Sequence, residues 1–259
     1  MATIDVHHTV DGPDEAPTVV LINSLGTTHE MWDPQIPSLA EEFRVVRHDM
    51  RGHGRSPIPR GPYSMAELGH DVLGLLDRLE VQQAHVVGLS IGGMVAQWLA
   101  SHAPERVARL ALLCTASRLE PADAWAQRAA TVRAEGTQAL ADTVVSRWFT
   151  SDFAAANPEI VARTRAMIAA TPAEGYAGCC GAIEGANLLP DLPAISAPTL
   201  VVAGAHDPST PPEVVERVAE HIPSARYVLL DDAAHLVNVQ RDQKVNHLLA
   251  EHLHGNGRD

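Results

Sequence analysis

The chain has 259 residues and a formal charge of −13, so its surface is acidic. Its apolar fraction of 46% and charged fraction of 20% are those of an ordinary globular protein of one large domain, or of a domain with an insertion. The charge argues against binding to nucleic acid or acidic membranes, because both attract basic surfaces. The sequence shows no apolar run of membrane-spanning length, and its first ten residues lack the basic-then-apolar pattern of a signal peptide.

Short apolar runs alternate with longer helical patterns, as in a parallel sheet with crossover helices. The predicted strands are Thr18–Asn23, Arg44–Asp49, Ala84–Leu89, Val107–Leu113, Thr199–Ala203 and Ala225–Leu230. Runs such as Val19–Ile22 are apolar on both faces, so we expect helices on both sides of the sheet. At the start of the chain, Thr3–Thr9 alternates loosely and is expected to add an antiparallel strand.

Two helical patterns support this α/β architecture. Met65–Leu79 keeps five apolar residues on one stripe, and Pro212–His221 begins with a proline that suits a first helical turn. The alternation breaks between about residues 120 and 189, where Ala-rich helical patterns stop at Gly136, Asn157-Pro158 and Thr171-Pro172. We expect residues 120–189 to form a helical cap over the carboxyl edge of the sheet and residues 1–119 and 190–259 to form the core; extra packing helices are the alternative.

The stretch Gly88–Gly92 matches G-x-S-x-G at the point where a strand stops and a helix starts. Glycines around a strained turn let strand and helix approach each other, and the Ser90 hydroxyl then projects at the top of the sheet. A phosphate loop is the competing interpretation, but neither of its glycine patterns is present. Ser90 is therefore the candidate nucleophile.

A serine hydroxyl needs a base, and the base needs an orienting acid, in the chain order Ser, Asp or Glu, His. Asp207 lies in the loop after one predicted strand, and His235 lies in the loop after the last one. The carboxyl ends of parallel strands gather such residues at one edge, so we expect Ser90, Asp207 and His235 to form a catalytic triad. Asp231 and Asp232 remain rivals for the acid, although neither begins a loop after a separate strand.

Other residue types offer weaker alternatives. His206 adjoins Asp207 but would point away from it in an extended loop. No H-E-x-x-H or Cys/His ligand spacing appears, so no metal and no organic cofactor is expected. The three cysteines, Cys114, Cys179 and Cys180, form no disulfide framework and have no evident base; buried, inert thiols of a cytoplasmic protein are expected.

The tetrahedral intermediate of acyl transfer needs hydrogen-bond donors. One should be the backbone N–H of Ile91, and the other should come from the loop after the first parallel strand, where we choose the N–H of Leu25. The segment Asp49–Ser56 is interpreted as a turn with buried charges that supports the site, with a catalytic role as the less favoured alternative.

Several segments together resemble the α/β-hydrolase fold and, more narrowly, the 3-oxoadipate enol-lactonases. The segments are Asn23–Thr27, Met31–Gln35, Arg51–Gly54, Gly61–Tyr63, Arg147–Thr150 and Glu174–Cys180. The last two lie in the predicted cap, which differs most between hydrolases of different specificity. The chain departs from the family at His48-Asp49-Met50, where Tyr-Asp-Thr is commoner, and in a shortened N-terminal segment.

The resemblance implies hydrolysis of 3-oxoadipate enol-lactone to 3-oxoadipate in aromatic catabolism. Because that substrate carries a carboxylate and the protein is acidic, a local cation should line the pocket. The candidates in the cap are Arg128, Arg133 and Arg147, with Trp125 and Trp148 as walls; each arginine is alternatively a surface charge, and each tryptophan a packing residue.

Rival functions share the same three catalytic residue types. They are hydrolysis of another small ester or lactone, cofactor-free haloperoxidase chemistry and carbon–carbon bond hydrolysis. A non-catalytic receptor of this fold is the alternative from a different class, and the intact set of Ser90, Asp207 and His235 argues against it.

Overall fold

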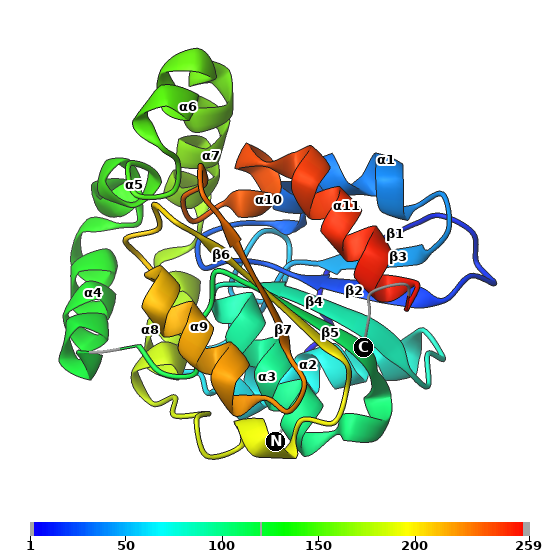
Figure 1. Cartoon of the computed structure of the whole chain (residues 1–259). Coiled ribbons are helices and arrows are strands. Elements are labelled where there is room, and N and C mark those ends of the chain that lie inside the picture. The colour runs from blue at the N-terminus through cyan, green and yellow to red at the C-terminus, as the bar shows by residue number, and fades with distance from the viewer. Residues whose placement is uncertain (1–2, 120, 256–259) are drawn as a thin grey trace.

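A computed structural model describes residues 3–119 and 121–255 of the chain. It contains a seven-stranded sheet in the order β1-β3-β2-β4-β5-β6-β7 (Figure 1). The strands are β1 (His8–Asp11), β2 (Thr18–Ile22), β3 (Arg44–His48), β4 (Ala84–Leu89), β5 (Val107–Leu113), β6 (Thr199–Gly204) and β7 (Arg226–Leu230). Every neighbouring pair is parallel except β1 and β3, which are antiparallel.

The six parallel strands agree with the sequence prediction to within one residue at each end. The antiparallel strand is present, but it starts at His8 rather than at Thr3. Before His8, two backbone amides bind side chains instead of a neighbouring strand: the Ile4 amide donates to Asp71 Oδ1 at 3.0 Å and the His7 amide to Ser56 Oγ at 2.9 Å. The amides of both residues are thus satisfied without a ladder.

Helices cover both faces of the sheet, as the doubly apolar strands predict. Alternate residues of β2 enter two separate cores: Val20 and Ile22 face one, and Val19 and Leu21 face the other. The first core is covered by α2 (Met65–Arg78), α3 (Ile91–His102) and α9 (Pro212–His221), and the second by η1 (His29–Gln35), α1 (Ile36–Leu39) and α11 (Asp242–Leu253). Short helices η2 (Pro104–Arg106), η3 (Leu192–Ala194) and α10 (Val237–Gln240) complete this part of the chain.

Local sequence explains where the predicted helix α2 starts. Ser64 accepts a hydrogen bond from the Glu67 amide, and the Glu67 carboxylate accepts one from the Ser64 amide in return. This capping box satisfies two amides that have no partner inside the helix. The predicted stripe of Leu68, Val72 and Leu75 is buried against the core.

The segment that follows β5 is helical, as predicted. It contains α4 (Ala122–Glu135), α5 (Gln138–Val145), α6 (Ser151–Ala156), α7 (Pro158–Ala170) and α8 (Ala173–Glu184). The three predicted stops fall at helix boundaries; at the first, Gly136 ends α4 with a φ of 80°. In Figure 1 these helices lie on one side of the sheet, with α5 to α7 beyond the carboxyl ends of β6 and β7. The division into a cap of residues 120–189 and a core remains a proposal, and residue 120 lies outside the described residues.

The helix α8 ties this segment to the rest of the molecule. A Cβ on Gly175 would lie 1.8 Å from the carbonyl oxygen of Gly52, so the two backbones touch. Tyr176, Cys179 and Cys180 are buried in the same core as α2 and α3. The proposed cap is therefore anchored along one whole helix.

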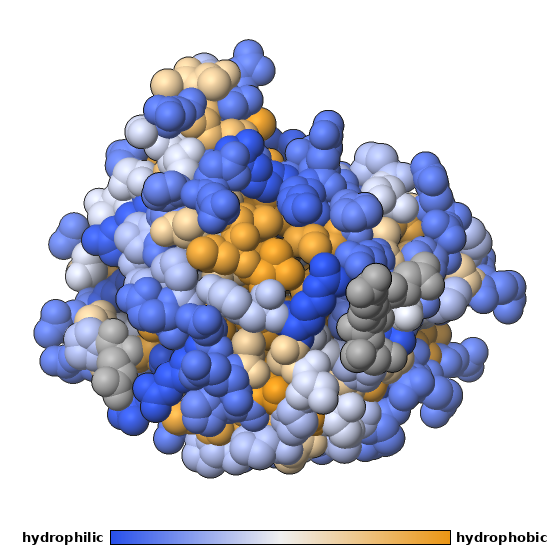
Figure 2. Space-filling model, viewed as in Figure 1, coloured by the Kyte–Doolittle hydropathy of each residue, from blue (hydrophilic) through white to orange (hydrophobic). Residues whose placement is uncertain are grey.

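The face of the molecule in Figure 2 is mostly hydrophilic. A hydrophobic area lies over the carboxyl half of β6 and β7, where Leu229 of the edge strand is 42% exposed. Among the described helices none is long and apolar enough to cross a bilayer.

Two buried histidines, His48 at the end of β3 and His53 in the turn after it, indicate that the stability of the fold decreases in acid. Burial lowers the pKa of His48 and of His53 to about 4, so the unfolded chain binds their protons near pH 6.5 and the folded chain does not. Their contribution to stability is complete above about pH 6.5 and is lost as the pH falls toward 4. We expect the free energy of unfolding to drop by up to about 3 kcal/mol for each imidazole over this window.

Urea unfolding at pH 7.5, 6 and 4.5 measures this dependence. A His48→Gln variant should show a shallower pH dependence than the wild type, and the same change at the exposed His247 should leave the dependence unaltered. A wild-type stability that stays level between pH 7.5 and 4.5 would contradict the expectation.

Candidate active site

Ser90 occupies a strained turn between β4 and α3, as the sequence motif predicts. Its φ of 60° and ψ of −123° are rare for a residue with a side chain. The turn is held by hydrogen bonds from the Ser90 amide to the Leu113 carbonyl at 3.0 Å and from Thr115 Oγ1 to the Ser90 carbonyl at 2.7 Å. A Cβ on Gly88 or Gly92 would lie 2.2 Å from a backbone oxygen, so these flanking glycines are required by close approach.

Asp207 and His235 form a buried acid–imidazole pair. Asp207 lies beyond the end of β6 and His235 beyond the end of β7, and His235 Nδ1 donates to Asp207 Oδ2 at 2.7 Å. Burial opposes the charge of Asp207, but the imidazole and the hydrogen bonds from Thr210 outweigh it, so the pKa of the carboxyl lies below its ordinary value. With Nδ1 donating to the carboxylate, Nε2 carries the free lone pair and is the basic atom.

Thr210 is a supporting residue that the sequence analysis missed. Its hydroxyl donates to Asp207 Oδ2 at 2.6 Å, and the amides of Ser209 and Thr210 donate to Oδ1 at 2.8 and 3.1 Å. Asp207 therefore accepts four hydrogen bonds when that from His235 is included. The carboxylate cannot rotate without breaking several of them.

The proposed triad members share one edge of the sheet. Strands β4, β5, β6 and β7 are consecutive neighbours, and Ser90, Asp207 and His235 follow three of their carboxyl ends. The structure joins Asp207 to His235 directly; in the described chain the Ser90 hydroxyl makes no hydrogen bond to the imidazole. Such contacts are often long before substrate binds.

The alternative residues for the acid and the base are not part of the Asp207–His235 contact. Asp231 and Asp232 are exposed, Asp232 forms an ion pair with Arg241, and His206 is exposed. Cys114 directly follows β5 and is fully buried, with its sulfur within 4.8 Å of ring and carboxylate atoms of the acid–imidazole pair, and burial raises the pKa of its thiol. Burial likewise raises the pKa of the Cys179 and Cys180 thiols.

Two backbone amides have the properties expected of an oxyanion hole. Leu25 is the second residue of a turn in which the Thr27 amide donates to the Ser24 carbonyl at 3.2 Å, and Ile91 is the first residue of α3. Within residues 3–119 and 121–255 neither amide donates a hydrogen bond. Both are therefore available to a developing negative charge.

The predicted support turn Asp49–Ser56 contains buried charges. The Arg51 guanidinium is 3% exposed and binds Asp71 at 2.6 and 2.8 Å and Glu67 at 3.0 Å. The Asp49 carboxylate accepts from the His29 ring at 2.9 Å and from the Arg55 amide at 3.0 Å. These contacts fasten the turn to α2 and to the segment after β2.

Two groups of side chains have atoms of metal-binding type within 4.8 Å of one another. They are His7 with His29 and Asp49, and Cys114 with Asp207 and His235. In the first group both Asp49 oxygens already accept backbone amides. In the second, the imidazole and carboxylate bind each other. The expectation that the protein uses no metal stays a prediction.

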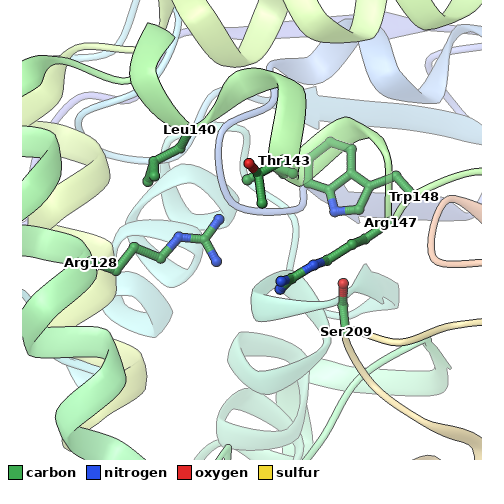
Figure 3. Close-up of a pocket in the computed structure, with 7 residues that line it drawn as sticks. Arg128, Leu140, Thr143, Arg147, Trp148 and Ser209 are labelled. Carbon is green, nitrogen blue, oxygen red and sulfur yellow. The ribbon is translucent and has the colours of Figure 1, made fainter.

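A cavity of about 210 Å³ lies between the helical segment and the acid–imidazole pair. Its lining residues are Arg128, Leu140, Thr143, Val144, Arg147, Trp148 and Ser209. The Ser209 amide binds Asp207, and the Trp148 ring lies 5.9 Å from the His235 ring, so the cavity adjoins the candidate chemistry. Figure 3 shows the guanidinium groups of Arg128 and Arg147 extending into it from opposite sides.

The three candidate cap arginines differ in their partners. Arg128 donates to the Tyr176 hydroxyl and lies over the rings of Trp125 and Tyr176, at 5.2 and 5.3 Å from the centroids. Neither Arg128 nor Arg147 has an acidic partner in the part of the chain that is described. Arg133 is outside the cavity lining and is paired with Glu174 at 2.9 Å. The structure thus brings two of the three to the cavity; Trp125 supports Arg128, while Trp148 forms a wall.

Comparison with known proteins agrees with this architecture. Residues 17–242 match the model of the alpha/beta hydrolase fold family. The chain is 41% identical to "3-oxoadipate enol-lactonase 2" of Acinetobacter baylyi, over 94% of this chain and 91% of that protein. It is 37% identical to "3-oxoadipate enol-lactonase 1" of the same organism, over 91% and 88% of the two chains.

A solved structure shows the same relationship in three dimensions. The crystal structure of the enol-lactonase from Burkholderia xenovorans superposes with a TM-score of 0.94 at 42% identity, covering 97% of this chain and 98% of that one. The chain therefore belongs to the alpha/beta hydrolase fold family and, within it, groups with the 3-oxoadipate enol-lactonases.

Proposed function

We propose that this protein is a serine hydrolase that opens 3-oxoadipate enol-lactone to 3-oxoadipate, a reaction of the β-ketoadipate pathway of aromatic catabolism. The relatives named above support the substrate. The observation that carries the proposal is the Asp207–His235 pair, which borders a cavity containing two guanidinium groups that have no acidic partner among the described residues. The Asp207–His235 pair supplies base catalysis, and the guanidinium groups match the negative charge of the lactone's carboxylate.

The first half-reaction forms an acyl-enzyme. Ser90 Oγ attacks the lactone carbonyl carbon while His235 Nε2 takes the hydroxyl proton, and Asp207 stabilises the resulting imidazolium. The amides of Leu25 and Ile91 bind the oxyanion. The ring C–O bond then breaks, the imidazolium protonates the enol oxygen, and the enol becomes the ketone of the product.

The second half-reaction releases the acid. A water molecule transfers a proton to His235 Nε2 and attacks the acyl carbon, and the C–O bond to Ser90 then breaks as the serine oxygen recovers that proton. No redox change occurs, and each proton that the imidazole accepts is returned. The Asp207 hydrogen bonds keep the imidazole in one tautomer through both halves.

Substrate selectivity tests the proposed function. Purified protein should hydrolyse the enol-lactone with a kcat/KM at least about tenfold above that for 4-nitrophenyl acetate, since the ester has no carboxylate to make the charge-assisted contact. Formation of 3-oxoadipate is followed by chromatography. Equal kcat/KM values for the two substrates would reject the lactone assignment in favour of a general esterase.

Arg128 is expected to bind the carboxylate of the substrate. Arg128→Met should raise KM for the enol-lactone about 10- to 100-fold and change kcat less, because a charge-assisted hydrogen bond contributes about 1.5–3 kcal/mol. Steady-state kinetics measures the split, and turnover of the neutral ester should be nearly unchanged.

Arg133→Met is the matched control for this prediction. Both arginines belong to α4, but Arg133 pairs with Glu174 outside the cavity. A larger KM increase in the control than in Arg128→Met would assign carboxylate binding to a different part of the surface.

A cytoplasmic location also remains a prediction, based on the three free thiols.

A further inference from the structure

The turn that carries the Leu25 amide depends on the orientation of one peptide group. The Ser24 carbonyl and the Thr27 amide close the turn at 3.2 Å, with Leu25 and Gly26 at its centre. Gly26 has a φ of 80°, the value of the third residue in a type II turn. A type I turn differs mainly by a half rotation of the central peptide, which exchanges the directions of the Leu25 carbonyl and the Gly26 amide.

His53 makes the hydrogen bond that distinguishes these two orientations. Its side chain is completely buried, and its Nε2 accepts the Gly26 amide at 3.0 Å. Its Nδ1 lies 3.2 Å from the Arg51 carbonyl oxygen, which can only accept. Nδ1 therefore carries the proton, and Nε2 is left as an acceptor.

The His53 ring itself is fixed by the support turn. The His53 amide donates to the Met50 carbonyl at 2.9 Å, and its carbonyl accepts the Ser56 amide at 3.0 Å. Arg51, the residue whose carbonyl orients the ring, is held by Asp71 on α2. Burial lowers the pKa of His53 to about 4, so the ring remains a neutral acceptor near pH 7.

We propose that His53 is a positioning residue for the oxyanion hole: it fixes the Leu25–Gly26 peptide, and with it the backbone torsions of the turn that holds the neighbouring Leu25 amide toward the oxyanion. In the alternative orientation, the Leu25 carbonyl would face the lone pair of Nε2, which is repulsive, and the Gly26 amide would lose its acceptor. The inference rests on the proposed acyl-enzyme chemistry for its effect on rate, but the hydrogen bond itself is independent of substrate.

The hydrogen bond is tested first in the wild-type protein. In ¹⁵N-labelled enzyme, a scalar coupling across the N–H···N bond should join the Gly26 amide nitrogen to His53 Nε2, and the Gly26 amide proton should exchange slowly with solvent. Absence of the coupling at pH 7 together with fast exchange overturns the proposal. This measurement does not depend on the identity of the substrate.

Kinetics of three variants then tests the effect on catalysis. His53→Met replaces the ring nitrogen with a thioether, a much weaker acceptor, at similar volume. It should lower kcat about 10- to 100-fold and change KM less than about threefold, which is less than the loss of an oxyanion donor costs. His53→Gln supplies an amide oxygen near the Nε2 position and should recover most of the rate. His48→Met is the matched control, because His48 is equally buried and its Nδ1 has no partner in the described chain.

The three variants are compared with the enol-lactone and with 4-nitrophenyl acetate, together with binding of a boronic acid that mimics the tetrahedral intermediate. Equal losses in His53→Met and His48→Met, or a His53→Gln variant as slow as His53→Met, would overturn the positioning role. If the wild-type protein did not hydrolyse the enol-lactone, the proposed substrate would be rejected. The ester and boronate measurements would still decide the role of His53.

Discussion

Ser90→Ala is expected to reduce turnover of the enol-lactone by at least about a thousandfold, because the acyl-enzyme has no other route and only oxyanion and binding effects remain. The midpoint of thermal unfolding should change little, since the strained turn is held by the Ser90 backbone and by Gly88 and Gly92 rather than by the hydroxyl. Steady-state kinetics and thermal unfolding measure the two effects. Labelling by a fluorophosphonate, followed by peptide mass spectrometry, should occur at Ser90 in the wild type and be absent from the variant.

Ser209→Ala is the control for this result. Ser209 also lines the cavity, but its contact with Asp207 is made by the backbone amide, which alanine retains. We expect turnover within about threefold of the wild type. If Ser90→Ala retained more than a tenth of wild-type turnover, the nucleophile would have to be another residue.

The sequence predicts those parts of the site that depend on short local sequence patterns. The glycines around Ser90 and the apolar run before it define a strand, a turn and a helix without distant information. Asp207 and His235 are found because each follows a strand whose carboxyl end must lie at the same edge. Thr210 was missed, although an aspartate in a loop commonly accepts the amides of the residues that follow it, and this turn brings the Thr210 hydroxyl to the carboxylate.

The choice among the cap arginines could not be made from local patterns. Arg128 and Arg133 both occur on α4, and only the position of Glu174, far along the chain on α8, removes Arg133 from the cavity. The contact of His53 with Gly26 is equally distant in sequence. The start of β1 was placed too early for the same reason, because the amides of Ile4 and His7 bind side chains of later segments.

Asp207→Asn provides the second large expected effect, a loss of about 10³- to 10⁴-fold in kcat. The shape of the side chain is kept, but the charge that stabilises the imidazolium is lost. The amides of Ser209 and Thr210 keep the oxygen atom of the new side chain at the Oδ1 position, which places its NH₂ group at the Oδ2 position, facing His235 and the Thr210 hydroxyl. His235 Nδ1 must then accept, Nε2 must carry the proton, and the base that activates Ser90 is removed.

Two further variants distinguish the effect of the Asp207 charge and the His235 tautomer from the effect of the position of the carboxylate. Thr210→Val deletes one hydrogen bond to Asp207 Oδ2 and leaves the carboxylate charged, so its loss in kcat should stay near tenfold. Asp232→Asn removes the charge of the rival acid, which pairs with Arg241 at the surface, and should leave kcat within about twofold. A large loss in Asp232→Asn with little loss in Asp207→Asn would reassign the acid. A small loss in every variant would instead mean that proton transfer to His235 does not limit the reaction.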